Sequence, residues 1–345
     1  MGAQWSVPVL CLAACFSAGP AFAQAPTEPG PGSSLDEIVV TGEFPGPGMW
    51  KVTRSGDTSG HVLWIVGDPW VLPKRWQWRS RDIEAKARSA QAILFDSAFS
   101  VTPDEKIGLL RGLTLAPAII KARRNPDGAT LADLLPPAMY ARWLVQKKLY
   151  LGRESGVEKW RPLFAAQKLL DAAFDELDLQ RGTVSGVVRK LATRQKIKVT
   201  VPLLEFKFQR AGIRDRIKEF ARESLADQEC LRATLDLTEA LARRDIESAR
   251  ARAWATGDLA ALTALPELPN PGLPCATAIA SSQVAHDLVP PDIRERLLAL
   301  WMTAAETSFG ANETTLAVVP FAKLTRADGY IDRLRARGYA VDAPE

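Results

Sequence analysis

Apolar and polar residues alternate in blocks that predict strand–turn–helix units near both ends of the chain. Two apolar runs flank "RSGDTSG", which predicts a β-hairpin formed by residues 49–53 and 61–66. Helical spacing follows over residues 80–90, and the apolar run of residues 92–95 predicts a short buried strand. A strand–turn–helix–strand order is typical of a parallel α/β sheet.

The middle of the chain has mostly helical periodicity. Apolar residues recur at i, i+3 and i+4 in "ATLADLLPPAMYARWLVQKKL", "VEKWRPLFAAQKLLDAAFDEL" and "VSGVVRKLATRQ", and one β-branched strand follows at residues 196–201. The end repeats the opening order, with a helix over residues 291–307, a strand over 314–320, a turn and a final helix. We therefore predict an α/β fold with a central, mostly parallel sheet built from the N- and C-terminal units and a large helical middle region.

Composition divides the chain into a cleavable N-terminal segment, a linker and one domain. The predicted parts are a signal peptide (1–23), a flexible leader rich in Pro, Gly, Ser and Thr (24–47) and a single domain (48–345). The domain divides further into an N-terminal α/β part (48–130), a mainly helical insert with one sheet strand near 196–202 (131–300) and a C-terminal α/β part (301–345).

The first residues resemble an export signal. "VPVLCLAACFSAGPAFA" is apolar with small residues at its end, so "AFA" predicts cleavage after Ala23. "LAAC" resembles a lipobox, which leaves the alternative of a lipoprotein anchored at Cys15. We expect a periplasmic or secreted protein in the first case. No later segment has about 18 uninterrupted apolar residues, so no transmembrane span is expected.

Composition and charge exclude a nucleic-acid partner. The 345 residues are 47% hydrophobic and 24% charged with a net charge of +4, which is ordinary for a globular protein. Nucleic-acid binding would require clustered Lys and Arg. Cys230 and Cys275 are the two cysteines outside the predicted signal peptide, and in an oxidising compartment such a pair predicts a disulfide.

The order "MWKV … LWIVGDPWVLPK … AILFD … VPLLE … TTLAVVPFAKLTRADGYIDRLRARGYAV" resembles the TraB/GumN family (TraB/PrgY/GumN-like) over about residues 47–343. The closing "DGYIDRLRARGYAV" is the most specific single match. The family pattern has one strand ending in G-T-x-H, one ending in an acidic residue, one with G-L-E and a last one ending in G-x-x-H-L. The resemblance implies a divalent metal held by the histidines and carboxylates, and metal-dependent hydrolysis.

This chain departs from the family at both histidines. It has "GDPW" in place of G-T-x-H and "PFAKL" in place of G-x-x-H-L, so Trp70 and Lys323 stand at the ligand positions. An indole nitrogen has no lone pair for a metal, and an ammonium group repels a cation. Asp68, Asp96 and Glu205 are the candidate catalytic remnants of the family site. We expect no bound metal or other cofactor.

Two histidines occur in the whole chain, His61 and His286. His61 is predicted at the start of a strand, roughly 16 Å from its end at ~3.3 Å per residue. His286 precedes a double proline and is predicted in a loop or at a helix end. Neither is expected to bind a metal.

These substitutions favour a protein without enzymatic activity: an exported pseudoenzyme or binding protein of the cell envelope. Its expected partner is an unknown envelope ligand, either a polysaccharide or a protein, and the tryptophan-rich turn around Trp70 is a candidate contact surface. The alternative is a metal-dependent, peptidase-like hydrolase with a relocated site built from Asp68, Asp96 and Glu205. We also hypothesise that Lys323 replaces the metal and holds Asp96 and Glu205.

Overall fold

The computed structural model describes residues 46–344, apart from residues 55, 57–58, 106–108, 210, 224 and 283–288. The predicted signal peptide, the lipobox cysteine Cys15, the leader up to residue 45 and His286 lie outside the described residues.

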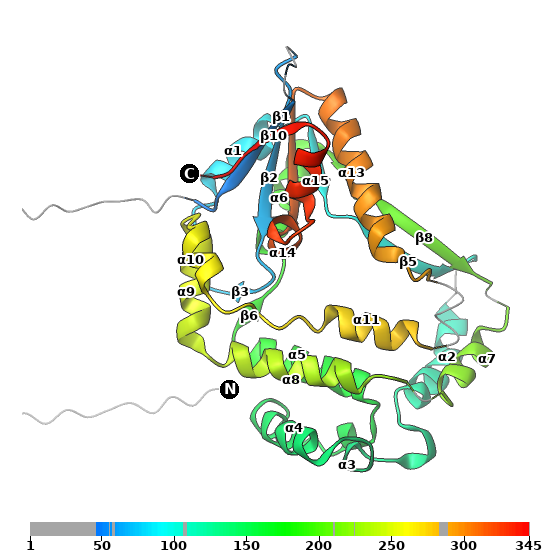
Figure 1. Ribbon diagram of the computed structural model, residues 1–345. Helices are drawn as coiled ribbons and strands as arrows, with labels where there is room; N and C mark the ends of the chain where they lie inside the picture. Colours follow the sequence, from blue (N-terminus) through cyan, green and yellow to red (C-terminus); the bar gives the residue numbers. More distant parts are fainter. Residues whose placement is uncertain are drawn as a thin grey trace, which may run out of the picture. The chain divides into compact units, whose positions relative to one another are not determined.

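The largest sheet has six strands in the order β10-β1-β2-β9-β4-β7; its strands β10, β1 and β2 are labelled in the upper part of Figure 1. Its strands are β1 (Met49–Arg54), β2 (Val62–Asp68), β4 (Ala92–Phe95), β7 (Lys198–Thr200), β9 (Thr314–Pro320) and β10 (Tyr339–Asp342). Strands β2, β9, β4 and β7 run parallel, and β1 pairs antiparallel with both β2 and β10. The predicted α/β fold with a mostly parallel sheet is confirmed.

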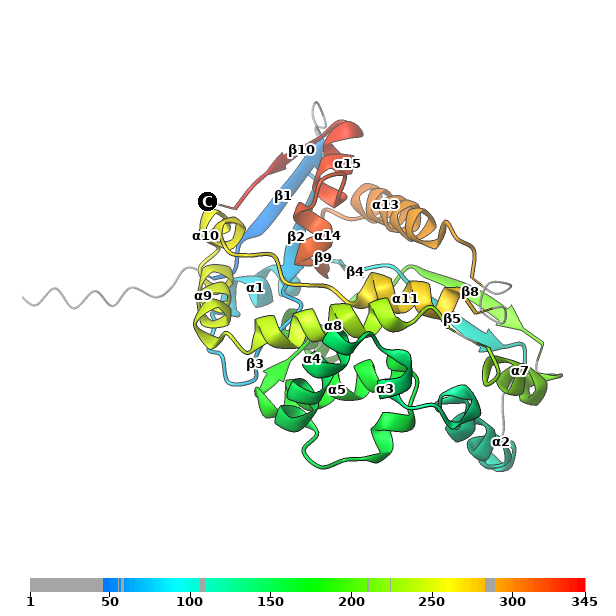
Figure 2. The same cartoon turned by 60° about the horizontal axis from the view of Figure 1, so that its bottom comes forward.

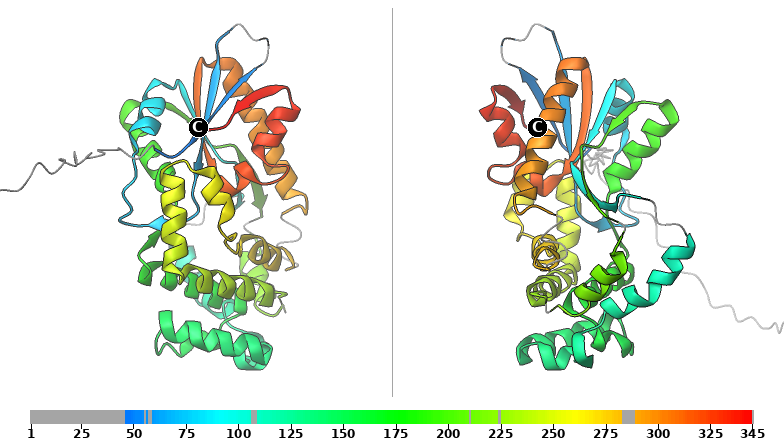
Figure 3. Two further views of the ribbon diagram at one scale, coloured as in Figure 1. Left: turned by 60° about the vertical axis from the view of Figure 1, so that its left-hand side comes forward. Right: turned by 90° about the vertical axis from the view of Figure 1, so that its right-hand side faces the viewer.

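Helices cover both faces of this sheet. Helices α1 (Arg81–Ser89), α6 (Thr183–Gln195) and α9 (Arg244–Ala255) pack on one face, and α13 (Ile293–Ala311), α14 (Phe321–Thr325) and α15 (Tyr330–Ala336) pack on the other. Figure 3 shows α1 and α6 on one side of the strands and α13 and α15 on the other. Because side chains alternate along a strand, Leu63 and Ile65 of β2 join the core with α13, whereas Val66 joins the core with α1 and α6.

The helical middle has its own apolar core. Helices α3 (Leu131–Leu134), α4 (Pro137–Tyr150), α5 (Pro162–Glu176), α8 (Gln228–Leu241) and α11 (Gly272–Ala280) surround it (Figure 2). Trp143 and Leu169 are fully buried there. Pro137 begins α4, where its missing N–H costs nothing, and thereby separates α4 from α3. The predicted disulfide is present and joins Cys230 of α8 to Cys275 of α11.

The other elements lie between the sheet and the helical middle along the chain, or within the helical middle itself. They are β3 (Leu72–Pro73), β5 (Ala98–Pro103), β6 (Leu179–Gln180), β8 (Leu203–Phe208), α2 (Leu109–Ala122), α7 (Ile213–Phe220), α10 (Leu259–Ala264) and the 3-10 turns η1 (Pro126–Gly128) and η2 (Gly156–Lys159). Strands β5 and β8 form a two-stranded parallel ribbon that follows β4 and β7 along the chain. No helix in the described part of the chain is both long and apolar enough to span a membrane.

Removing the disulfide should destabilise the helical middle. The bridge closes a loop of 45 residues, and in the chain-entropy model such a closure is worth roughly 4 kcal/mol. We expect the Cys230→Ala/Cys275→Ala double variant to lose up to this much free energy of unfolding, measured by urea denaturation. The wild type measured with reductant is the matched control and should approach the variant. Equal stability of the variant and the oxidised wild type would contradict a structural role.

Candidate functional site at the strand ends

The carboxyl ends of the parallel strands meet at one edge of the sheet. Asp68 at the end of β2 lies opposite Pro320 at the end of β9, and Phe95 at the end of β4 pairs with Val318. Asp96 follows directly after β4. In open α/β sheets this edge is the usual position of a ligand site, and it holds two of the three carboxylates predicted from the sequence.

Asp68 caps a helix. Its Oδ1 accepts a hydrogen bond from the backbone N–H of Val184 at 3.1 Å, and its Oδ2 accepts from the backbone N–H of Ser185 at 3.0 Å and from the Ser185 hydroxyl. These N–H groups belong to the first turn of α6, where no intrahelical acceptor exists. Burial raises the pKa of Asp68 above its ordinary value, and the hydrogen bonds from Ser185 and Val184 oppose that rise. Both carboxylate oxygens are therefore engaged in holding α6.

The turn that carries Asp68 is held by its neighbours. The indole nitrogen of Trp254 donates to the carbonyl of Gly67 at 3.0 Å. A Cβ at Gly67 would lie 2.6 Å from the ring of Phe321 and 3.3 Å from its Cα, so only glycine fits this approach of α14 to β2. The strand end is thus fixed from both faces of the sheet.

Asp96 is the centre of a charged cluster on the opposite face. Its Oδ2 accepts a hydrogen bond from the Lys323 ammonium at 2.6 Å, and its Oδ1 accepts from the Tyr330 hydroxyl at 2.5 Å. The side chain of Asp96 is 19% exposed and that of Lys323 is 36% exposed. The hypothesis that Lys323 pairs with Asp96 agrees with this geometry.

Helices α14 and α15 position the two donors. A tight turn separates the helices, since a Cβ at Gly329 would lie 2.6 Å from the carbonyl oxygen of Lys323. Tyr330 begins α15 and stacks on Trp301, with ring centroids 4.0 Å apart. Burial, followed by the charge of Asp96 and the hydrogen bond to it, raises the pKa of Tyr330. The phenol therefore stays protonated at neutral pH and donates to Asp96.

The other residues singled out in the sequence lie elsewhere. Glu205 is exposed on β8, where it pairs with Ser100, four residues beyond Asp96 along the ribbon. Trp70 is 36% exposed and lies edge-on to Phe174, with ring centroids 6.0 Å apart. Neither joins the cluster around Asp96.

His61 lies at the opposite end of the sheet from these carboxylates. It precedes β2, and its Nδ1 is 2.9 Å from the carbonyl oxygen of Phe309. This contact is consistent with the predicted hairpin position and holds the ring away from the strand ends.

The strand ends do not fit a divalent metal. Asp68 and Asp96 point to opposite faces of the sheet, because Asp68 continues the row of Val66 and Asp96 continues the row of Leu94. Among the residues that the structure describes, which excludes the gaps within 46–344, no group of three or more His, Cys, Asp or Glu side chains could share a metal ion. An ammonium group already neutralises Asp96.

Three residues of this region were not identified from the sequence: Ser185, Tyr330 and Trp254. Ser185 lies in "GTVSG", at the start of a predicted helix, where a serine signals a helix terminus. Tyr330 follows "ADG", a turn signal between two predicted elements. The contact of Trp254 with Gly67 joins residues 187 apart in the sequence and leaves no local signal.

A model of the TraB/PrgY/gumN family matches residues 48–343. The match covers nearly the whole of the predicted single domain and confirms the family inferred from the motifs. Comparison with curated proteins and with solved structures gave no match.

Breaking the ion pair at Asp96 should destabilise the fold. We expect Lys323→Met to lower the free energy of unfolding by about 1–2 kcal/mol, between the values of exposed and buried pairs. A double-mutant cycle with Asp96→Asn should give a coupling energy of similar size, measured by urea denaturation. Arg333→Met, which breaks the exposed 2.6 Å pair with Asp328, is the matched control and should cost much less. A coupling energy near zero at Asp96 would refute the role of Lys323.

The free energy of unfolding should depend on pH through the titration of Asp68. Because its pKa is raised above 3.8 in the folded chain, the folded state binds more protons than the unfolded state between the two pKa values. The contribution of Asp68 to the free energy of unfolding is fully present below pH 3.8 and is lost as pH rises through the folded pKa. Asp68→Asn cannot titrate. The wild type should therefore lose stability relative to this variant as pH rises, and a constant or growing difference in urea denaturation would contradict the prediction.

Proposed function

This chain is a member of the TraB/PrgY/gumN family, and on that premise we propose that it is a non-catalytic member: an exported pseudoenzyme or binding protein of the cell envelope. The proposal has two parts, the loss of metal chemistry at the strand ends and a location outside the cytoplasm. Each part has separate support.

The contact between Lys323 and Asp96 is the observation that supports the loss of metal chemistry at the strand ends. The ammonium nitrogen is 2.6 Å from the carboxylate, in the turn where the family motif has its second histidine. A metal ion at this carboxylate would have to displace the ammonium or lie beside it, and two like charges at such distances repel. The cation that balances Asp96 is therefore a side chain of the protein itself.

Asp68 supports the same conclusion on the other face. Three of the about four lone-pair sites of the Asp68 carboxylate already accept hydrogen bonds from α6, and a metal that displaced these bonds would leave their donors unpaired. Each unpaired buried donor costs about 1–3 kcal/mol. The turn at the first family motif has a structural role here, and Trp70 at its histidine position carries no metal-binding atom.

The disulfide supports export. Bridges of this kind persist in oxidising compartments and are rare in the cytosol, and Cys230 is buried against the helix that carries Cys275. Together with the apolar start of the sequence, this favours a periplasmic or secreted location, with lipid anchoring at Cys15 as the alternative.

The exposed tryptophan is the proposed contact for an envelope ligand, a polysaccharide or a protein. The guanidinium carbon of Arg181 lies 5.7 Å from the centre of the Trp70 ring and 4.2 Å from that of Phe174. An aromatic face beside a cation offers stacking and hydrogen bonding to either ligand.

Metal content tests the proposal. Protein purified without chelators or a histidine tag should contain zinc, manganese and iron in amounts far below one equivalent, measured by mass spectrometry. The metal content of Lys323→His, which restores the family residue, is compared with that of Lys323→Met as its matched control. Stoichiometric metal in the wild type that is lost in Asp68→Asn and Asp96→Asn would overturn the proposal in favour of the carboxylate-based hydrolase.

A further inference from the structure

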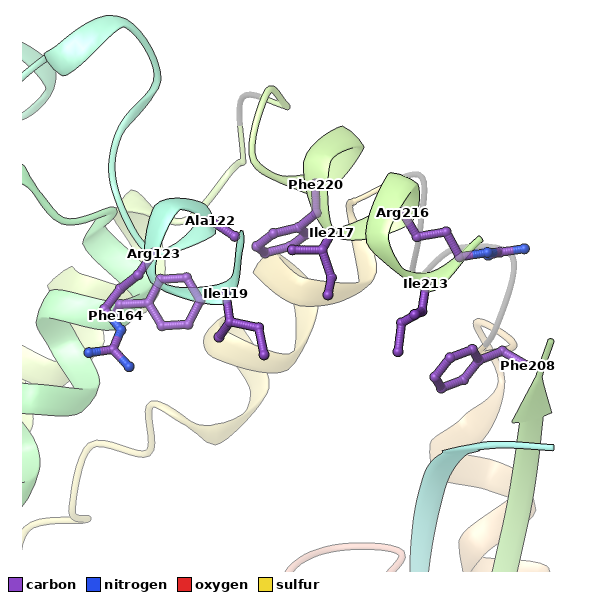
Figure 4. Close-up of a pocket in the computed structure, with 9 residues that line it drawn as sticks. All are labelled: Ile119, Ala122, Arg123, Phe164, Phe208, Ile213, Arg216, Ile217 and Phe220. Carbon is purple, nitrogen blue, oxygen red and sulfur yellow. The ribbon is translucent and has the colours of Figure 1, made fainter. Parts of the chain in front are cut away.

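An apolar cavity of about 350 Å³ lies between α2, α7, the start of α5 and the end of β8 (Figure 4). Its volume is at the lower end of the range of roughly 300–1,000 Å³ that is usual for small-molecule sites. The cavity lies away from the strand ends and shares no lining residue with the Asp96 cluster. The apolar side chains in its lining include Ile119, Phe164, Phe208, Ile213, Ile217 and Phe220.

Within the part of the chain that the structure describes, these side chains form a partly exposed apolar surface. None of the six belongs to the four buried apolar clusters. Ile119 is 50% exposed, and the other five are partly exposed. Phe164 and Phe220 meet edge to face, with ring centroids 6.5 Å apart. Six large apolar side chains facing one cavity are typical of a site for an apolar ligand.

A buried arginine fixes the wall of the cavity. Arg161 is 2% exposed, and its guanidinium donates to the carbonyl of Arg124 at 3.2 Å and to the carbonyl of Phe220 at 2.8 Å. These carbonyls follow the end of α2 and close α7, the two helices that face each other across the cavity. Arg161 therefore ties the chain just after α2 to the last residue of α7 beside the cavity.

The charge at the rim has one sign. Among the described residues, the charged side chains in the lining are Arg123 and Arg216, and no described carboxylate lines the cavity. Figure 4 shows their guanidinium groups at opposite ends of the row of apolar side chains. Arg123 lies over the ring of Trp160, 4.7 Å from its centre. Arg216 makes no ion pair within the described residues, so its charge is open to a ligand.

We propose that this cavity binds a single-chain anionic amphiphile, with its acyl chain along the apolar row and its carboxylate at Arg216. An uncharged apolar ligand would leave the guanidinium unpaired, whereas a carboxylate pairs with it in a geometry that arginine favours. The volume suits one acyl chain and not a lipid with two. The inference goes beyond the proposed function and does not depend on it, because the cavity and the strand ends have no residue in common.

Titration calorimetry of the full protein with dodecanoate, below its micelle-forming concentration, tests the proposal. We expect one dodecanoate per chain, and each methylene removed from the chain should weaken binding about fourfold. Ile217→Gln should weaken binding at least tenfold. Leu149→Gln, on the exposed face of α4 and outside the cavity, is the matched control and should leave it unchanged; Leu149 is 60% exposed.

The head-group assignment has a separate test. Arg216→Gln should weaken dodecanoate binding severalfold and leave dodecanol binding unchanged, whereas Lys218→Gln, on the same helix but outside the lining, should alter neither. Absence of dodecanoate binding, or an equal loss in Ile217→Gln and Leu149→Gln, would overturn the site. Equal sensitivity of dodecanoate and dodecanol to Arg216→Gln would overturn the role of the charge.

A second copy of the chain is the competing occupant of this surface. If Ile217→Gln abolished self-association in sedimentation while dodecanoate failed to bind the wild type, the cavity would be an interface and the proposal would be wrong. These outcomes are independent of the metal content at the strand ends, so either proposal can fail alone.

Discussion

Strand β9 pairs in parallel with β2 on one side and with β4 on the other, and this pairing organises the whole sheet. It brings a strand from the last tenth of the chain into the middle of a sheet that the first hundred residues begin. Because β9 runs parallel to both neighbours, its carboxyl end lies beside theirs. Asp68, Asp96 and the turn with Lys323 therefore meet at one edge, although they are far apart in the sequence.

The alternation of side chains along the strands then decides what this edge can do. It sends Asp68 to the face covered by α6 and Asp96 to the face covered by α14 and α15. Each carboxylate finds a donor from the protein on its own face, a helix terminus for one and an ammonium and a phenol for the other. The same edge that gathers ligands in related architectures serves here as two separate structural anchors.

Much of this architecture could be predicted from the sequence because periodicity and turn residues report on local structure. The hairpin around Gly56, the buried strand before Asp96 and the helices of the middle region follow from such patterns. The pairing of Lys323 with Asp96 could be hypothesised because both follow strand ends. Glu205 lies apart from them on β8, because Pro202 separates β7 from β8 and the chain continues beyond the edge of the sheet.

Because β9 lies in the middle of the sheet, the sheet is incomplete during much of the synthesis of the chain. Residues 314–320 are synthesised long after β2 and β4, so these two strands exist for much of translation without the strand that lies between them. Two apolar strands with unpaired edges invite pairing with other chains, and sheets closed by distant segments fold slowly. Until β9 is synthesised, the edges of β2 and β4 that face it are therefore open to pairing with other chains.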